Sequence, residues 1–71
     1  MNFTINGVLR EFPELSPGAT LEELIEALEL KGDRVAVEHN GDIVTRSRWA
    51  DTPVHSGDKF EIVHFVGGGH S

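Results

Sequence analysis

The feature that most constrains the fold of this chain is a single segment with helical periodicity. The other ordered segments have the period of strands. The segment has a single apolar stripe at positions i, i+3, i+4 and i+7, formed by Leu21, Leu24, Ile25 and Leu28. Thr20 and Glu23 have the spacing of a capping box and predict the helix start, and Gly32 is the predicted stop. One helical stripe can cover one sheet face, so the sequence predicts a two-layer α+β domain.

The rest of the chain predicts strands joined by tight turns. Alternating apolar residues indicate strands over 2–6, 8–12, 34–39, 43–45 and 59–66, with a helical turn over 46–51 around Trp49. Asn6-Gly7 and Asn40-Gly41 favour turns, because Asn and Gly tolerate positive φ. The first and last strands can lie side by side in a mixed sheet of four to five strands. That arrangement is the β-grasp, or ubiquitin-like, fold, although other α+β topologies use the same elements.

Length and charge exclude several classes of function. The chain has 71 residues, no cysteine and a net charge of −6. It therefore has no disulfide, thiolate zinc site or cysteine nucleophile. The acidic balance argues against a nucleic-acid partner. No apolar run is long enough to span a membrane and no signal sequence opens the chain, so we expect a cytoplasmic protein without a membrane partner.

The predicted core lies between the helical stripe and one face of the sheet. That face should contain Phe3, Ile5, Val35, Val37 and Ile62. In the last strand Phe60 and Ile62 point to this core, whereas Val63 and Phe65 point to the other face. With one helical layer that other face should be partly exposed, and an exposed apolar patch often marks a partner site. Val63 and Phe65 are therefore predicted to dock a partner, unless nearby loops or Trp49 cover them.

No residue constellation predicts an active site in this chain. The four histidines lack the i, i+4 spacing of a helical metal pair, and no cysteine accompanies them. The acidic residues of the helix are better explained as a solvated face than as an acid–base pair. We therefore expect that the chain binds no metal and is not itself an enzyme.

The glycine run at 67–69 is the most informative motif. Three residues without a Cβ can enter a channel too narrow for side chains. Gly67, Gly68 and Gly69 are accordingly predicted to form a tail, over 67–71, that follows a single domain at 1–66 and threads into a partner enzyme. A frayed terminus or a cloning remnant would explain the same residues.

The end of the chain, Phe60 to Gly69, resembles the C-terminus of the ThiS family, the sulfur carriers of thiamine biosynthesis. The segments Val35–Gly41 and Ile43-Val44, the residues Arg46 and Trp49, and Gly57-Asp58 agree as well. The resemblance covers nearly the whole chain. It implies a β-grasp carrier that binds no cofactor itself and has two partner enzymes. An E1-like adenylating enzyme would use ATP and magnesium to activate the terminal glycine carboxylate, which becomes a thiocarboxylate. Thiazole synthase would then take the sulfur.

His70 and Ser71 depart from the family pattern, in which the tail usually ends on glycine. We hypothesise that cleavage after Gly69 produces the active terminus, with Gly68 as the second choice; a cloning remnant is the rival explanation. Two other functions remain open at this point. One is a molybdopterin-synthase small subunit or another ubiquitin-like sulfur donor, and the other is a ubiquitin-like interaction domain whose tail has no chemistry.

Overall fold

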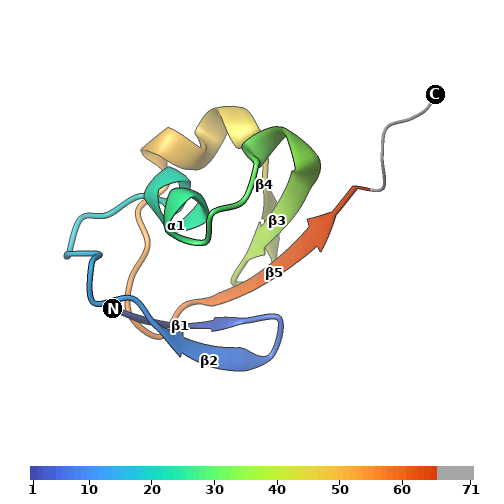
Figure 1. Ribbon diagram of the computed structural model, residues 1–71. Helices are drawn as coiled ribbons and strands as arrows, with labels where there is room; N and C mark the ends of the chain where they lie inside the picture. Colours follow the sequence, from blue (N-terminus) through green and yellow to red (C-terminus); the bar gives the residue numbers. More distant parts are fainter. Residues whose placement is uncertain (66–71) are drawn as a thin grey trace.

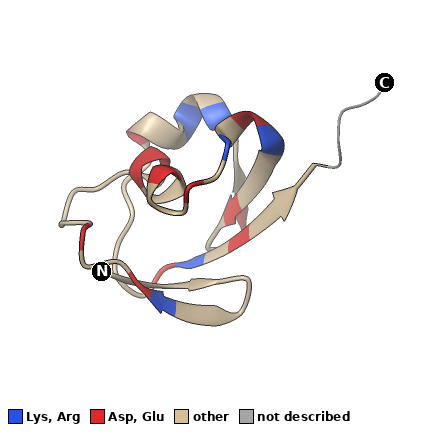
Figure 2. Ribbon diagram, in the orientation of Figure 1, with Lys and Arg blue, Asp and Glu red and all other residues tan. Residues whose placement is uncertain are grey.

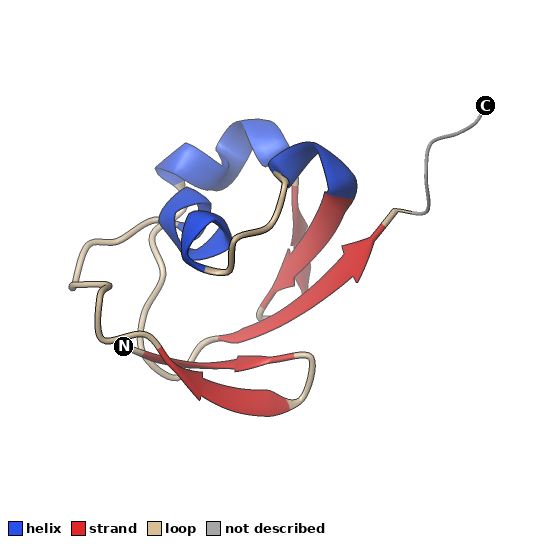
Figure 3. Cartoon of the chain, in the orientation of Figure 1, coloured by secondary structure: helices blue, strands red, loops and turns tan. Residues whose placement is uncertain are grey.

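Helices and strands occupy separate layers in the computed structural model, which describes residues 1–65 (Figures 1 and 3). The strands are β1 (Asn2–Ile5), β2 (Val8–Glu11), β3 (Val35–His39), β4 (Asp42–Val44) and β5 (Lys59–His64). The helices are α1 (Leu21–Ala27) and two 3-10 helices, η1 (Gly32–Arg34) and η2 (Arg46–Asp51). In Figure 3 the helices lie together over one side of the strands. The two-layer α+β prediction is confirmed.

The five strands form one mixed sheet in the order β2-β1-β5-β3-β4. β1 and β5 are parallel and central, with Thr4 opposite Lys59 and Ile5 opposite Phe60. The other neighbours are antiparallel. This is the predicted β-grasp topology, in which the two ends of the domain meet in the middle of the sheet.

The side chain of Asn6 extends the short pairing between β1 and β5. Asn6 accepts a hydrogen bond at Oδ1 from the Ile62 amide (2.7 Å) and donates from Nδ2 to the Ile62 carbonyl (3.1 Å). Its backbone has φ 51°, the left-handed conformation that the turn requires. Asn6 therefore both closes the β1–β2 turn and holds the middle of β5.

α1 begins as predicted and ends earlier than predicted. The capping box is present, with the Glu23 amide bonded to Thr20 Oγ1 and the Thr20 amide bonded to Glu23 Oε1. The prediction that the helix continues to Gly32 is wrong, because α1 ends at Ala27 and Glu29 adopts φ 59°. Amides of Glu29 and Leu30 bond back to Glu26 and Ile25, as in a Schellman motif. The chain thus terminates its helix with a non-glycine residue in the left-handed region.

The core lies between α1, η2 and the inner face of the sheet. It contains the five predicted sheet residues together with Phe60, Leu21, Leu24 and Ile25. Leu28 is only half-buried, because α1 ends at Ala27 and Leu28 is its C-cap residue. Trp49 is buried within this core and donates from Nε1 to the Val44 carbonyl at 3.0 Å. Phe12, Ala19 and Val54, in connecting segments, are also buried.

Candidate functional site

The outer face of the sheet, opposite the helices, exposes apolar side chains near the end of β5. Val63 is 62% exposed and Phe65 is 57% exposed, as predicted. Ala36 of β3 lies directly opposite Val63, and Ile43 of β4 is 76% exposed. We call these four residues, Ala36, Ile43, Val63 and Phe65, the apolar patch. Its exposure confirms the face assignment, whereas the docking role of Val63 and Phe65 stays a prediction.

Ile43 and Ala36 were not among the predicted docking residues, because their place beside Val63 depends on how β3, β4 and β5 pair. Ile43 lies opposite Glu38, and Glu38 lies opposite Glu61. Side chains at directly opposed positions share a face, so these residues all lie on the outer face. The register between strands, which no single segment specifies, brings Ile43 to the same face as Val63.

A backbone hydrogen bond anchors the end of β5 to the start of β3. The Phe65 amide donates to the Arg34 carbonyl at 2.8 Å. The apolar patch is therefore attached to the sheet up to the last described residue. Val66, the predicted tail residues Gly67, Gly68 and Gly69, and the two residues after them lie outside the described residues, as does the predicted domain boundary at 66.

A shallow apolar hollow of about 420 Å³ borders the apolar patch. It opens where β4 ends after Val44, so that the first residues of β3 have no strand beside them on that side. We call it the β3 groove. Its walls come from η1, β3, β4, η2 and Phe65, and they include Gly32, Ala36, Ile43, Arg46, Trp49 and Phe65.

Charge is unevenly distributed around this end of the molecule. Figure 2 shows Lys and Arg gathered around η1 and η2, whereas Asp and Glu mark α1 and the sheet. Four of the six basic residues lie between positions 31 and 48, namely Lys31, Arg34, Arg46 and Arg48. The outer face is acidic next to Ile43 of the apolar patch, through the opposed pair Glu38 and Glu61. The apolar patch thus has a basic border on one side and an acidic border on the other.

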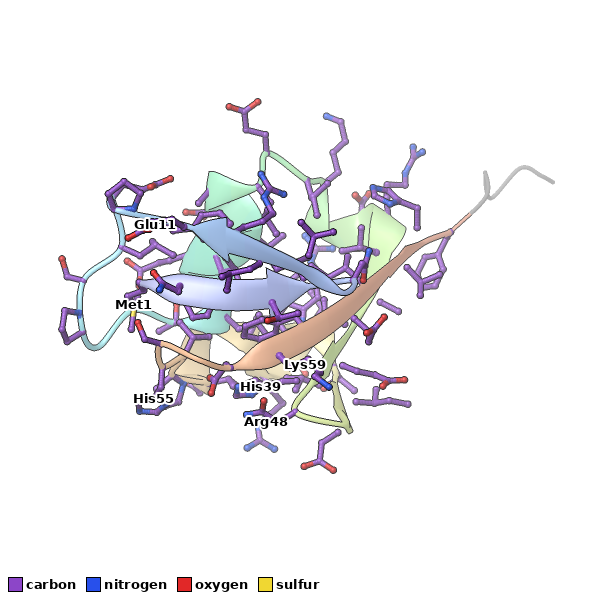
Figure 4. The ribbon with its side chains drawn as sticks, turned by 90° about the horizontal axis from the view of Figure 1, so that it is seen from below. Met1, Glu11, His39, Arg48, His55 and Lys59 are labelled. Carbon is purple, nitrogen blue, oxygen red and sulfur yellow. The ribbon has the colours of Figure 1, made fainter. Side chains whose placement is uncertain are left out.

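A polar cluster at the start of β5 joins the β3–β4 turn to the turn that precedes β5; its members His39 and His55 are labelled in Figure 4. Asp58 accepts hydrogen bonds from His39 Nε2 (2.7 Å), from Asn40 Nδ2 (3.2 Å) and from the His55 amide (2.9 Å). Burial raises the pKa of the Asp58 carboxyl, but these hydrogen bonds outweigh it and hold the pKa below its ordinary value. The His39 ring stacks on Phe60 with centroids 4.8 Å apart. This cluster connects β3 and the β3–β4 turn to the residues just before β5. It lies at the start of β5, whereas the apolar patch lies at the end of β5.

Neither a metal cluster nor a membrane span occurs in the described part of the chain. Within residues 1–65 no group of three or more His, Cys, Asp or Glu side chains is arranged to hold a metal ion. The same residues contain no helix of the length and apolar character that crossing a membrane requires. The carboxylates of α1, Glu22, Glu23 and Glu26, are exposed to solvent.

The fold and the exposed end of β5 define a β-grasp protein, and in its sequence Gly67, Gly68 and Gly69 follow shortly after that strand. A model of the ThiS family matches residues 3–69. The chain is 38% identical over 50 residues to the sulfur carrier protein ThiS of Bacillus subtilis, covering 70% of this chain and 76% of that protein. It resembles the crystal structure of a thiamine biosynthesis protein (ThiS) from Geobacter metallireducens, with a TM-score of 0.81, 34% identity and coverage of 97% and 100%. The chain therefore belongs to the ThiS family.

Two longer relatives are thiazole synthases. The chain is 45% identical over 69 residues to a thiazole synthase of Paramagnetospirillum magneticum, which covers 97% of this chain. It is 40% identical over 52 residues to a thiazole synthase of Magnetococcus marinus, which covers 73% of this chain. The chain spans 20% and 16% of the length of these two proteins. A segment similar to this chain thus occurs within proteins that are named for the synthase.

Proposed function

We propose that this chain is a sulfur carrier in thiamine biosynthesis and that its partners, rather than the chain itself, supply the catalytic groups. The observation that carries the proposal is the family match over residues 3–69, which includes Gly67, Gly68 and Gly69. The described residues, 1–65, contain no group of side chains arranged to hold a metal ion, which is compatible with catalytic groups supplied by partners.

The proposed chemistry takes place at the carboxylate of Gly69. In an E1-like adenylating enzyme this carboxylate attacks the α-phosphate of ATP, with magnesium neutralising the phosphates, and pyrophosphate leaves. Hydrosulfide, the simplest sulfur source, then attacks the acyl carbon of the adenylate, AMP leaves, and a thiocarboxylate remains on Gly69 with release of one proton. Thiazole synthase accepts that sulfur. Three successive residues without side chains suit such a tail to a narrow active-site channel.

The carboxylate requirement makes the length of the tail testable. In the 71-residue chain Ser71 carries the terminal carboxylate and His70 adds a ring next to it. We expect the adenylating enzyme to catalyse rapid pyrophosphate exchange with a chain that ends at Gly69 and slow exchange with the 71-residue chain. A chain that ends at Gly68 decides between the two candidate termini. Equal exchange with all three chains would refute the processing hypothesis.

The thiocarboxylate itself is tested by intact-mass analysis. After incubation with the adenylating enzyme, ATP, magnesium and a sulfur source, the chain ending at Gly69 should gain the mass of one sulfur in place of one oxygen. Omission of ATP is the control. A chain that is adenylated and never gains sulfur, with every sulfur source tried, would contradict the carrier function and favour an interaction domain.

The apolar patch supplies the proposed docking surface for the partner enzymes. Phe65 is more than half exposed, so replacing it with aspartate should leave the fold intact and weaken binding by tenfold or more, as removal of a central interface residue does. Leu9 is the matched control, because it is 70% exposed on the same face of the sheet and lies on the far edge strand β2. If Phe65→Asp and Leu9→Asp weaken binding equally, the apolar patch is not the docking surface.

A further inference from the structure

Arg46 lies at the rim of the β3 groove in a position that the surrounding residues define. A methyl group at Gly32 would lie 3.0 Å from Trp49 Cζ3 and 3.2 Å from Arg46 Nε. Because Gly32 has no side chain, the guanidinium of Arg46 and the indole of Trp49 can both lie close to the backbone of η1. Trp49 is buried and held by its hydrogen bond to the Val44 carbonyl. Arg46 and Trp49 thus both lie close to Gly32 and line the same groove.

The charge of Arg46 is not neutralised by the described part of the chain. Among residues 1–65 the close pairs of opposite charge are Arg34 with Asp33 at 4.0 Å, and His39 and His55 with Asp58. Asp33 also lines the groove, but its nearest cation is Arg34. Glu22 and Glu26 of α1 border a second small hollow with Arg46, and neither comes within ion-pair distance of it.

The β3 groove thus combines an apolar wall with one cation that has no ion-pair partner among residues 1–65. Ala36, Ile43 and Phe65 supply apolar surface, and Arg46 supplies a planar fork of donors that matches a carboxylate. Arginine is enriched among the residues that dominate the binding energy of an interface. The groove is also continuous with the apolar patch, because Ala36, Ile43 and Phe65 belong to both.

We propose that the β3 groove binds a segment of thiazole synthase in which an apolar side chain is adjacent to an aspartate or glutamate. The apolar side chain enters between Ile43 and Phe65, and the carboxylate pairs with Arg46. The assignment of the partner rests on the proposed function and on the occurrence of a similar segment within two thiazole synthases. It identifies Arg46 as a second anchor of the docking surface, separate from the tail.

Binding of the chain to its cognate thiazole synthase, measured by titration calorimetry, tests this proposal. Arg46→Glu should weaken the affinity by at least tenfold, and Arg46→Gln should weaken it less. Arg48→Glu is the matched control, because Arg48 lies in the same 3-10 helix, carries the same charge and does not line the groove. The affinity of the parent should also fall more steeply with salt than that of Arg46→Gln. Equal affinities of Arg46→Glu and Arg48→Glu would overturn the proposal.

A cross-linking experiment keeps the proposal testable if Arg46→Glu fails to fold. Arg46→Lys retains the charge, and a carbodiimide should join the new amine to the partner carboxylate in an amide bond that mass spectrometry locates. Arg48→Lys is the control and should give no such link. A link to a residue with no apolar neighbour, or no link at all, would refute the proposed segment. If the parent chain itself does not bind the synthase, the proposed function fails instead, so the two failures are distinguishable.

Discussion

Two leucines of the same helical stripe should respond very differently to truncation. Leu24 has no exposed surface and packs in the middle of the core, whereas Leu28 is half-buried at the cap of α1. Leu24→Ala leaves a cavity that the surrounding core cannot fill and should cost about 3–5 kcal/mol. Leu28→Ala removes the same atoms from a site open to water and should cost about 1 kcal/mol, about half the transfer free energy of those atoms.

These costs are large against the stability of a domain of this size. A chain of this length is expected to have a free energy of unfolding of roughly 4–11 kcal/mol. Trp49 is the one tryptophan and is buried, so its fluorescence reports unfolding in guanidinium. With a slope of about 2 kcal/mol per molar, the midpoint should fall by about 2 M for Leu24→Ala and by about 0.5 M for Leu28→Ala. Equal shifts for the two variants would refute the early end of α1 as the reason for the difference.

Three further predictions concern residues outside the helical stripe. Asn6→Gly keeps the left-handed turn but loses both hydrogen bonds to Ile62, so chemical denaturation should show a loss of about 1–3 kcal/mol; a loss confined to Asn6→Ala would mean that only the turn matters. Glu29→Gly should raise the free energy of unfolding by about 1 kcal/mol, because it removes the strain of φ 59°, and an unchanged melting temperature would contradict that strain. Asp58→Ala should destabilise the protein at neutral pH by about 2–3 kcal/mol. The folded-state pKa of Asp58 is lowered, so this difference should be complete above about pH 4 and shrink as the pH falls through the lowered pKa; thermal melts that show a constant difference down to pH 2 would remove the Asp58 carboxylate as its cause.

The elements of this protein and their inner faces follow from local sequence. The start of α1 at Thr20 follows from the capping-box spacing, and the burial of Phe3, Ile5 and Phe60 follows from alternation with a period of two. These features depend on residues within one turn or one strand, so a single segment contains the information. The exposure of Val63 and Phe65 follows from the same alternation once one helical layer is assumed.

Tertiary structure alone decided where α1 ends and which residues join the apolar patch. Glu29 adopts the left-handed conformation because packing around Leu30 and the Schellman hydrogen bonds outweigh its local preference. Gly32 does not end the helix; its lack of a side chain instead leaves room for Trp49 and Arg46. Arg46 is 14 positions away from Gly32 in the sequence. Ile43 and Val63 reach one face because the order and register of β3, β4 and β5 place them there. These contacts join residues that are distant in the chain, so they form only when the sheet has formed. No single segment of the sequence therefore specifies them.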